Sequence, residues 1–228
     1  MRDRYVEKLD QLQKELLEMG MLCEEAIMKT YRLLISTESR DETADEIDRL
    51  ENEIDGKEQS IESICLQLLL RQQPVASDLR RISAAMKMIT DLERIGDQAT
   101  DITEIMKTGS IDVPVKGVAI TQMAEFTVGM VNKSVEAYVN RDLELAKEVI
   151  DSDDKLDAMF LDVRRALTEP AAAEQFCNDQ ILDLLMIAKY YERIGDHATN
   201  IGEWVEFSLT GVHRQGKKVY NVFGVYAQ

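Results

Sequence analysis

The sequence predicts an all-α protein made of a tandem duplication of an antiparallel three-helix bundle, with six long helices. Three observations lead to this prediction. The 228 residues include only three prolines and 6% aromatic residues, a composition that favours helices. Apolar residues recur at helical spacing. A ten-residue phrase occurs twice, as ERIGDQATDI from Glu93 and as ERIGDHATNI from Glu192, and such a repeat indicates a duplicated unit.

The first half contains three predicted helices. Apolar residues at helical spacing predict a helix over residues 2–35 and a second over residues 41–71. Pro74 then breaks the chain. A third helix begins near Ser77, which we expect to be its N-cap, and extends to residue 107. We expect this first bundle to occupy residues 1–111.

The second half repeats the plan over residues 112–228. We expect helices over residues 117–139, 142–167 and 179–209, with a turn around Pro170 before the last of them. The end of the chain, residues 217–228, alternates valine and tyrosine. This pattern indicates a strand or an ordered tail.

Composition excludes several functions. A formal net charge of −16 argues against direct nucleic-acid binding, which depends on Lys and Arg at phosphates. No run approaches eighteen apolar residues and the N-terminus lacks an apolar signal segment, so we expect neither membrane insertion nor secretion. Cys23, Cys65 and Cys177 are widely spaced, and we expect them to be reduced, buried thiols of a cytoplasmic protein.

The repeated phrase carries side chains that could bind cations at positions i, i+4 and i+8, and we call each set a ladder. The ladders are Glu93, Asp97 and Asp101 in the first copy and Glu192, Asp196 and Asn200 in the second. On a helix these positions share a face, and like charges four residues apart repel by a few tenths of a kcal/mol. We therefore expect a cation, either arginine or a metal ion, to offset the repulsion. The alternative is a solvated helix face.

Two other residues of the phrase need an explanation. Arg94 and Arg193 follow the first acidic residue and point about 100° away from it around the helix, so we expect them to pair with acids on a neighbouring helix. Gly96 and Gly195 lie inside the helix, where glycine costs roughly 1 kcal/mol relative to alanine. We favour close helix packing as their role over room for ions beside the carboxylates.

A second acidic group lies early on each middle helix. Its members are Asp45, Asp48 and Glu51 in the first half and Asp154 and Asp157 in the second. Because the middle helix runs antiparallel to the ladder helix, we expect its start to lie near residues 97–101 in one half and 196–200 in the other. Two acidic faces brought together repel unless cations lie between them. Acids near a helix start also serve as caps and dipole partners, and both interpretations stay open for Asp154.

A site made of carboxylates selects hard ions such as Mg²⁺, Mn²⁺, Ca²⁺ or ferric iron. Zinc usually recruits His or Cys, although it can also occupy carboxylates. We expect His197 to lie on the surface rather than to ligate. His213, after the last helix, gives little information.

The phrase RQQPVASDLR at residues 71–80, leading into DLERIGDQATDI, resembles the PhoU family of phosphate-signalling regulators over nearly the whole chain. This resemblance implies duplicated three-helix bundles that repress the phosphate-starvation response when phosphate is plentiful. It implies contacts with a phosphate ABC transporter, through its ATPase subunit, and with a sensor histidine kinase. It also implies a homodimer and bound metal ions, including iron clusters, held by E(D)xxxD motifs.

Carried over by resemblance, the metal ligands are both ladders together with Asp45, Asp48, Asp154 and Asp157. Glu51 with Asp55, and Asp153 with Asp157, also satisfy the motif, so the opposing set stays open by one helical turn. Asn200 brings an amide oxygen without charge, which implies fewer or more weakly bound ions at the second site.

Three classes of function remain. The sequence favours a regulatory adaptor that is not an enzyme and that binds metal ions on carboxylates, with iron, manganese or magnesium expected.

 A di-iron enzyme would need Glu-x-x-His pairs, which this chain lacks, and we expect Glu93 and Asp97 to face outward from the bundle. In a purely structural scaffold without a phosphate role, both ladders would be solvated surface.

Overall fold

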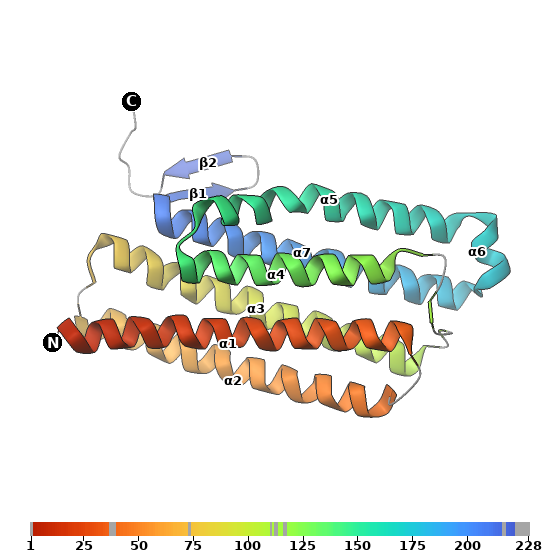
Figure 1. Ribbon diagram of the computed structural model, residues 1–228, viewed down its shortest axis with the longest axis horizontal. Helices are drawn as coiled ribbons and strands as arrows, with labels where there is room; N and C mark the ends of the chain where they lie inside the picture. Colours follow the sequence, from red (N-terminus) through yellow and green to blue (C-terminus); the bar gives the residue numbers. More distant parts are fainter. Residues whose placement is uncertain are drawn as a thin grey trace.

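Six long helices form two antiparallel three-helix bundles in the computed structural model (Figure 1), which confirms the predicted fold class. The structure describes residues 2–36, 40–72, 74–109, 111, 114–115, 118–215 and 218–221. The helices of the first bundle are α1 (Arg2–Ile35), α2 (Arg40–Gln72) and α3 (Ala76–Thr108). Those of the second bundle are α4 (Ile120–Asn140), α5 (Leu143–Thr168) and α7 (Asn178–Thr210).

Helix boundaries follow local capping chemistry, with one departure from expectation. The carboxylate of Asp142 accepts hydrogen bonds from the backbone N–H groups of Glu144 and Leu145, both at 3.0 Å, and so caps α5. The expectation that Ser77 caps α3 was wrong. The N-cap is Val75, without a side-chain cap, and α3 begins at the residue after it.

Two short elements lie outside the six helices. A helix of six residues, α6 (Pro170–Gln175), occupies the predicted turn, with its proline at the first helical position, where the missing N–H costs nothing. After α7, β1 (Val212–Gln215) pairs antiparallel with β2 (Lys218–Asn221). The strand expected in the tail is confirmed over β2, and the rest of that prediction, residues 217 and 222–228, lies outside the described residues.

The two bundles lie side by side and share one hydrophobic core. The most extensive helix–helix contact in the described molecule joins α3 to α7, and α1 also packs against α4. Buried polar groups bridge the bundles as well. The hydroxyls of Thr30 and Tyr191 lie 2.8 Å apart, and the Tyr138 hydroxyl donates to the backbone carbonyl of Arg81 at 3.2 Å. These bonds satisfy groups that would be costly to bury alone.

The cysteines differ in their surroundings. Cys23 and Cys65 are buried free thiols, as expected, and the Cys23 Sγ donates to the carbonyl of Leu92 at 3.3 Å. Cys177 is exposed, which corrects the expectation of a buried thiol. It lies at the N-cap of α7, where the chain turns at the end of the bundle.

No helix among the described residues is long and apolar enough to cross a membrane.

The glycines of the repeated phrase mark close helix contacts. A Cβ atom built on Gly96 would lie 3.0 Å from the Cδ1 atom of Ile54 on α2. A Cβ atom on Gly195 would overlap the Cδ2 atom of Leu156 on α5. Glycine therefore lets the middle helix of each bundle approach the ladder helix, as the sequence analysis favoured.

Replacing Gly96 or Gly195 with valine should lower the free energy of unfolding by about 2 kcal/mol, because the added atoms overpack these contacts. Urea unfolding followed by circular dichroism measures the change. Gly56→Val is the matched control, since a Cβ atom there meets no atom within 4 Å. It should change stability by no more than about 0.5 kcal/mol, and equal effects at all three positions would contradict the packing role.

Candidate metal sites at two helix pairs

Five carboxylates gather where α2 packs on α3, and we call them the first acidic site. They are Glu51, Asp55 and Glu58 on α2 and Glu93 and Asp97 on α3. The Glu93 and Asp97 side chains are 20% and 31% exposed, so they lie at the seam between the helices rather than facing outward as expected. Burial raises the pKa of Glu93, and the charges of Asp97, Glu58 and Asp55 raise it further, although Arg94 opposes them.

The other α2 members experience the same crowding. The pKa of Glu51 is raised, first by burial and then by the charges of Asp55, Asp97 and Asp48. The pKa of Glu58 is also raised, by burial and by the charges of Asp55 and Glu62. Glu58 was not predicted from the sequence as a member of this site. Its signal was the acidic stripe that continues from Asp55 at a spacing of three residues.

Four carboxylates gather in the same way where α5 packs on α7, and we call them the second acidic site. They are Asp153 and Asp157 on α5 and Glu192 and Asp196 on α7. Desolvation raises the pKa of Asp196 to about 6, with further contributions from the charges of Glu192 and Asp153. The pKa of Asp153 is raised by burial, and it accepts a hydrogen bond from the Thr199 hydroxyl at 3.2 Å.

The two acidic sites are equivalent because the helices pack in the same register. Ile54 lies against Gly96, and Leu156 lies against Gly195. One residue after each apolar contact comes Asp55 or Asp157. The structure therefore favours one of the opposing sets that the sequence left open in each bundle. It favours Glu51 with Asp55 over Asp45 with Asp48, and Asp153 with Asp157 over Asp154 with Asp157.

The earlier acids of the middle helices lie elsewhere. The Asp48 carboxylate is 3.2 Å from the Lys107 Nζ atom near the end of α3. Asp48 also lines a hollow with Thr100 and Glu104, so it lies at the far end of the expected region opposite residues 97–101 and toward Lys107. Asp45 is exposed, and its side chain has no hydrogen bond or ion pair with any described residue. Asp154 is exposed beside Asp153, whose pKa its charge helps to raise.

The third position of each ladder turns away from the acidic site. Eight residues along a helix bring a side chain about 80° around the axis, which directs Asp101 and Asn200 toward the contact of α3 with α7. The Asn200 Nδ2 atom donates to the Asp91 Oδ1 atom at 3.1 Å. Burial raises the pKa of Asp101. The hydrogen bond that Asp101 accepts from Tyr190 and the charge of Arg193 both oppose this rise.

The two contacts at the third positions are equivalent, since Asp91 and Tyr190 occupy matching places before the two phrases. Asp91 was not identified from the sequence, because the matching position in the second repeat is Tyr190 and no acidic residue recurs there. His197 also meets Asp91, with its Nδ1 atom 2.9 Å from the Oδ1 atom and its side chain 23% exposed. The expectation that His197 is a surface residue was wrong.

The cations nearest the acidic sites come from the ladder helices themselves. The Arg94 Nη1 atom lies 2.7 Å from the Asp97 Oδ2 atom, and its Nε atom lies 3.4 Å from Glu93. At the second acidic site, Lys189 forms an ion pair with Glu192 from a position that holds Thr90 in the first repeat. The ion pairs of Arg94 lie within its own helix, because Arg94 and Asp97 are three residues apart and adjacent on the helix surface. The expected interaction with a neighbouring helix is limited to the charge of Glu58 on α2. Arg193 does lie near Asp101 of α3, as expected.

The donor atoms of both sites suit a hard metal ion, but they are not arranged as a ready-made centre. Among the described residues, no three His, Cys, Asp or Glu side chains converge closely enough to hold an ion. Like charges repel and Arg94 and Lys189 hold carboxylates, which keeps the side chains apart. A bound ion would have to release the carboxylates from these partners. The raised pKa values show that each site would gain from added positive charge.

Asp196→Asn should stabilise the metal-free protein at pH 8. The pKa of Asp196 in the folded protein, about 6, exceeds its usual value of 3.8, so its contribution to stability is present below about pH 4 and is lost as the pH rises through 6. Because this side chain is exposed and water screens its charge, we expect a gain of about 1 kcal/mol or less. Urea unfolding at pH 4 and pH 8 measures it. A gain that is equal at both pH values would contradict the assignment.

The fold and the paired seams define a duplicated helical-bundle protein with two equivalent acidic sites. A family model described as the PhoU domain matches residues 16–106 and 120–205. The phosphate-specific transport system accessory protein PhoU homolog of Clostridium acetobutylicum is 35% identical over 206 residues, which cover 89% of this chain and 93% of that protein. The chain belongs to the PhoU family.

Solved structures agree with this assignment. The crystal structure of PhoU from Pseudomonas aeruginosa matches with a TM-score of 0.81 at 28% identity, over 91% of this chain and 99% of that chain. The phosphate transport system regulatory protein PhoU from Streptococcus pneumoniae has the same fold, with a TM-score of 0.79 at 24% identity over 91% of this chain and 97% of that one.

Proposed function

We propose that this protein is a negative regulator of phosphate uptake and of the phosphate-starvation response, and that it acts as a metal-binding adaptor rather than as an enzyme. The proposal is supported by its membership of the PhoU family and by a relative whose name describes an accessory protein of phosphate-specific transport. The observation that carries the metal-binding part is the pair of equivalent acidic sites, each with raised carboxylate pKa values.

A metal ion at these sites would cross-link helices. Glu51 and Asp55 would contribute oxygen atoms from α2, and Glu93 and Asp97 would contribute them from α3. Iron, manganese and magnesium suit such ligands, and zinc can also occupy carboxylates. The ion would neutralise the crowded charges and join the middle helix to the ladder helix. Asp153, Asp157, Glu192 and Asp196 would do the same between α5 and α7.

The adaptor would act in the cytoplasm, as a homodimer, between the ATPase subunit of a phosphate ABC transporter and a sensor histidine kinase. Long helical faces are suited to such docking because they present side chains over a large rigid surface. Its acidic surface, with a net charge of −16, favours basic protein surfaces as partners.

A scaffold without bound metal is the second candidate, and one observation favours it. Arg94 and Lys189 already neutralise a carboxylate at each site, so a cation is available without a metal. The two candidates differ in metal content, which direct measurement decides.

Wild-type protein titrated with Mn²⁺ should bind it with a stoichiometry that falls when the first acidic site is removed. Asp55→Ala with Asp97→Ala removes one carboxylate from each helix, and we expect at least a tenfold loss of affinity at that site. Electron paramagnetic resonance of free Mn²⁺ measures the binding. Asp45→Ala is the matched control on the same helix and should bind as the wild type does. Equal binding by all three proteins would exclude the first acidic site.

Deleting the gene should switch on a phosphate-starvation reporter in phosphate-rich medium, because the repressing adaptor is gone. Restoring the wild-type gene should silence the reporter. The Asp55→Ala and Asp97→Ala double variant should restore less repression than Asp45→Ala, provided that both accumulate to equal levels on an immunoblot. A reporter that stays silent after deletion would contradict the regulatory function.

A further inference from the structure

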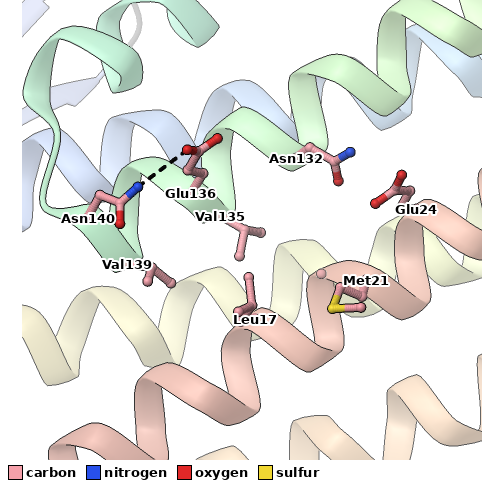
Figure 2. Close-up of a pocket in the computed structure, with 9 residues that line it drawn as sticks. Leu17, Met21, Glu24, Asn132, Val135, Glu136, Val139 and Asn140 are labelled. Carbon is pink, nitrogen blue, oxygen red and sulfur yellow. Dashed lines mark hydrogen bonds between the residues drawn. The ribbon is translucent and has the colours of Figure 1, made fainter.

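A groove lies between α1 and α4, along the seam where the two bundles meet (Figure 2). Its volume is about 380 Å³. Leu17 and Met21 line it from α1, and Val135 and Val139 line it from α4. Glu24 and Glu136 lie at its rim. None of these residues takes part in the acidic sites.

The groove exists because the two helices approach closely at one point. A Cβ atom on Gly20 would lie 2.9 Å from the Cγ2 atom of Val135. On either side of this contact, longer side chains form the walls. Leu17 is 43% exposed and Met21 is 60% exposed, and because they are four residues apart they lie on one face of α1. Large apolar side chains are thus left open to solvent along the groove.

The surroundings of the groove are negatively charged. A neighbouring hollow of about 340 Å³ between α1 and α2 shares Met21 and is bordered by Glu25 and Glu53. Glu25 has Lys29 as an ion-pair partner at 3.3 Å. Within the described part of the chain, by contrast, no ion pair involves Glu24, Glu53 or Glu136. Lys57 also borders this hollow and pairs with Glu18. Met21 is therefore an exposed apolar side chain near two carboxylates without an ion pair to a described residue, Glu24 and Glu53.

We infer that this groove docks an amphipathic helix of a partner protein, with apolar side chains on Leu17, Met21 and Val135 and with lysine or arginine beside Glu24 and Glu136. The lining runs from Leu17 to Glu24 on α1, about two helical turns or roughly 10 Å. This length fits two turns of a helix that presents apolar anchors four residues apart.

Charge decides between this occupant and others. A second copy of the chain docked through the same groove would bring two acidic rims together, and like charges disfavour that contact. An anionic lipid surface would be repelled for the same reason. A basic helix gains attraction from the rim and apolar contact from the floor.

The inference rests on the adaptor function proposed above, because an adaptor needs a surface on which a partner docks. The test is independent of phosphate and metal. A groove that binds nothing, with an intact deletion phenotype, would remove the docking site and leave the regulator standing. A reporter that stays silent after deletion, together with a groove that still binds the peptide, would remove the regulatory function and leave the docking site standing.

The probe is a synthetic helix-forming peptide of about 18 residues with leucines on one face and lysines on the other. A scrambled peptide of the same composition is its control, with equal charge but no apolar face. Methionine methyl groups labelled with ¹³C report binding by NMR, with Met21 assigned through Met21→Leu. We expect a saturable shift of Met21 and at least about tenfold weaker binding of the scrambled peptide. Met186, 45% exposed on α7, should not shift.

Variants locate the contact. Met21→Asp and Leu17→Asp should each weaken binding by about tenfold or more, measured by the fluorescence anisotropy of labelled peptide. Leu182→Asp, at a residue that is 59% exposed on α7, should leave binding unchanged. Glu24→Gln with Glu136→Gln should weaken binding severalfold, whereas Glu169→Gln with Glu174→Gln, the same change in net charge, should not.

Four results would overturn the inference. The first is no saturable shift of Met21 up to about 1 mM peptide. The second is an equal shift at Met186, and the third is equal binding of the scrambled peptide. The fourth is a Met21 signal that changes with protein concentration alone, which would show that a second copy covers the groove.

Discussion

The contact between a glycine of the ladder helix and an apolar side chain of the middle helix determines where the acidic sites form. Ile54 on Gly96 and Leu156 on Gly195 set the register of each helix pair. A shift of one turn would move the carboxylates of α2 and α5 past those of α3 and α7. Because the same contact occurs in both bundles, the duplication reproduces a site and not merely a fold.

The register also creates an electrostatic cost. Carboxylates that crowd together at a partly desolvated seam disfavour ionisation, and the raised pKa values of Glu93, Asp153 and Asp196 record that cost. Arg94 and Lys189 offset part of it from within the ladder helices. A metal ion that displaced them would offset more, since it carries at least two charges and can be shared by both helices. This difference between a side-chain cation and a metal ion separates a static scaffold from a protein whose helix packing responds to metal.

The sequence was sufficient for the fold and for placing the first two residues of each ladder side by side on one helix. Helical periodicity and the repeated phrase depend on local spacing, and spacing alone places Glu93 beside Asp97. It was insufficient for the opposing acids, because the register of α2 on α3 depends on how Ile54 packs on Gly96. The different surroundings of the third ladder position have a simpler cause. Each step of four residues turns a side chain by about 40° around the helix, so two steps direct Asp101 toward α7. The contact of His197 with Asp91 joins separate repeats, and no local pattern encodes it.

Anomalous diffraction from crystals soaked in Mn²⁺ would test the central claim, that the packing register builds two equivalent cation sites. The account predicts anomalous peaks at the α2–α3 seam, beside Glu51, Asp55, Glu93 and Asp97, and at the α5–α7 seam, beside Asp153, Asp157, Glu192 and Asp196. Peaks only at the earlier acids Asp45 and Asp48, or none at either seam while Arg94 and Lys189 keep their ion pairs, would contradict it.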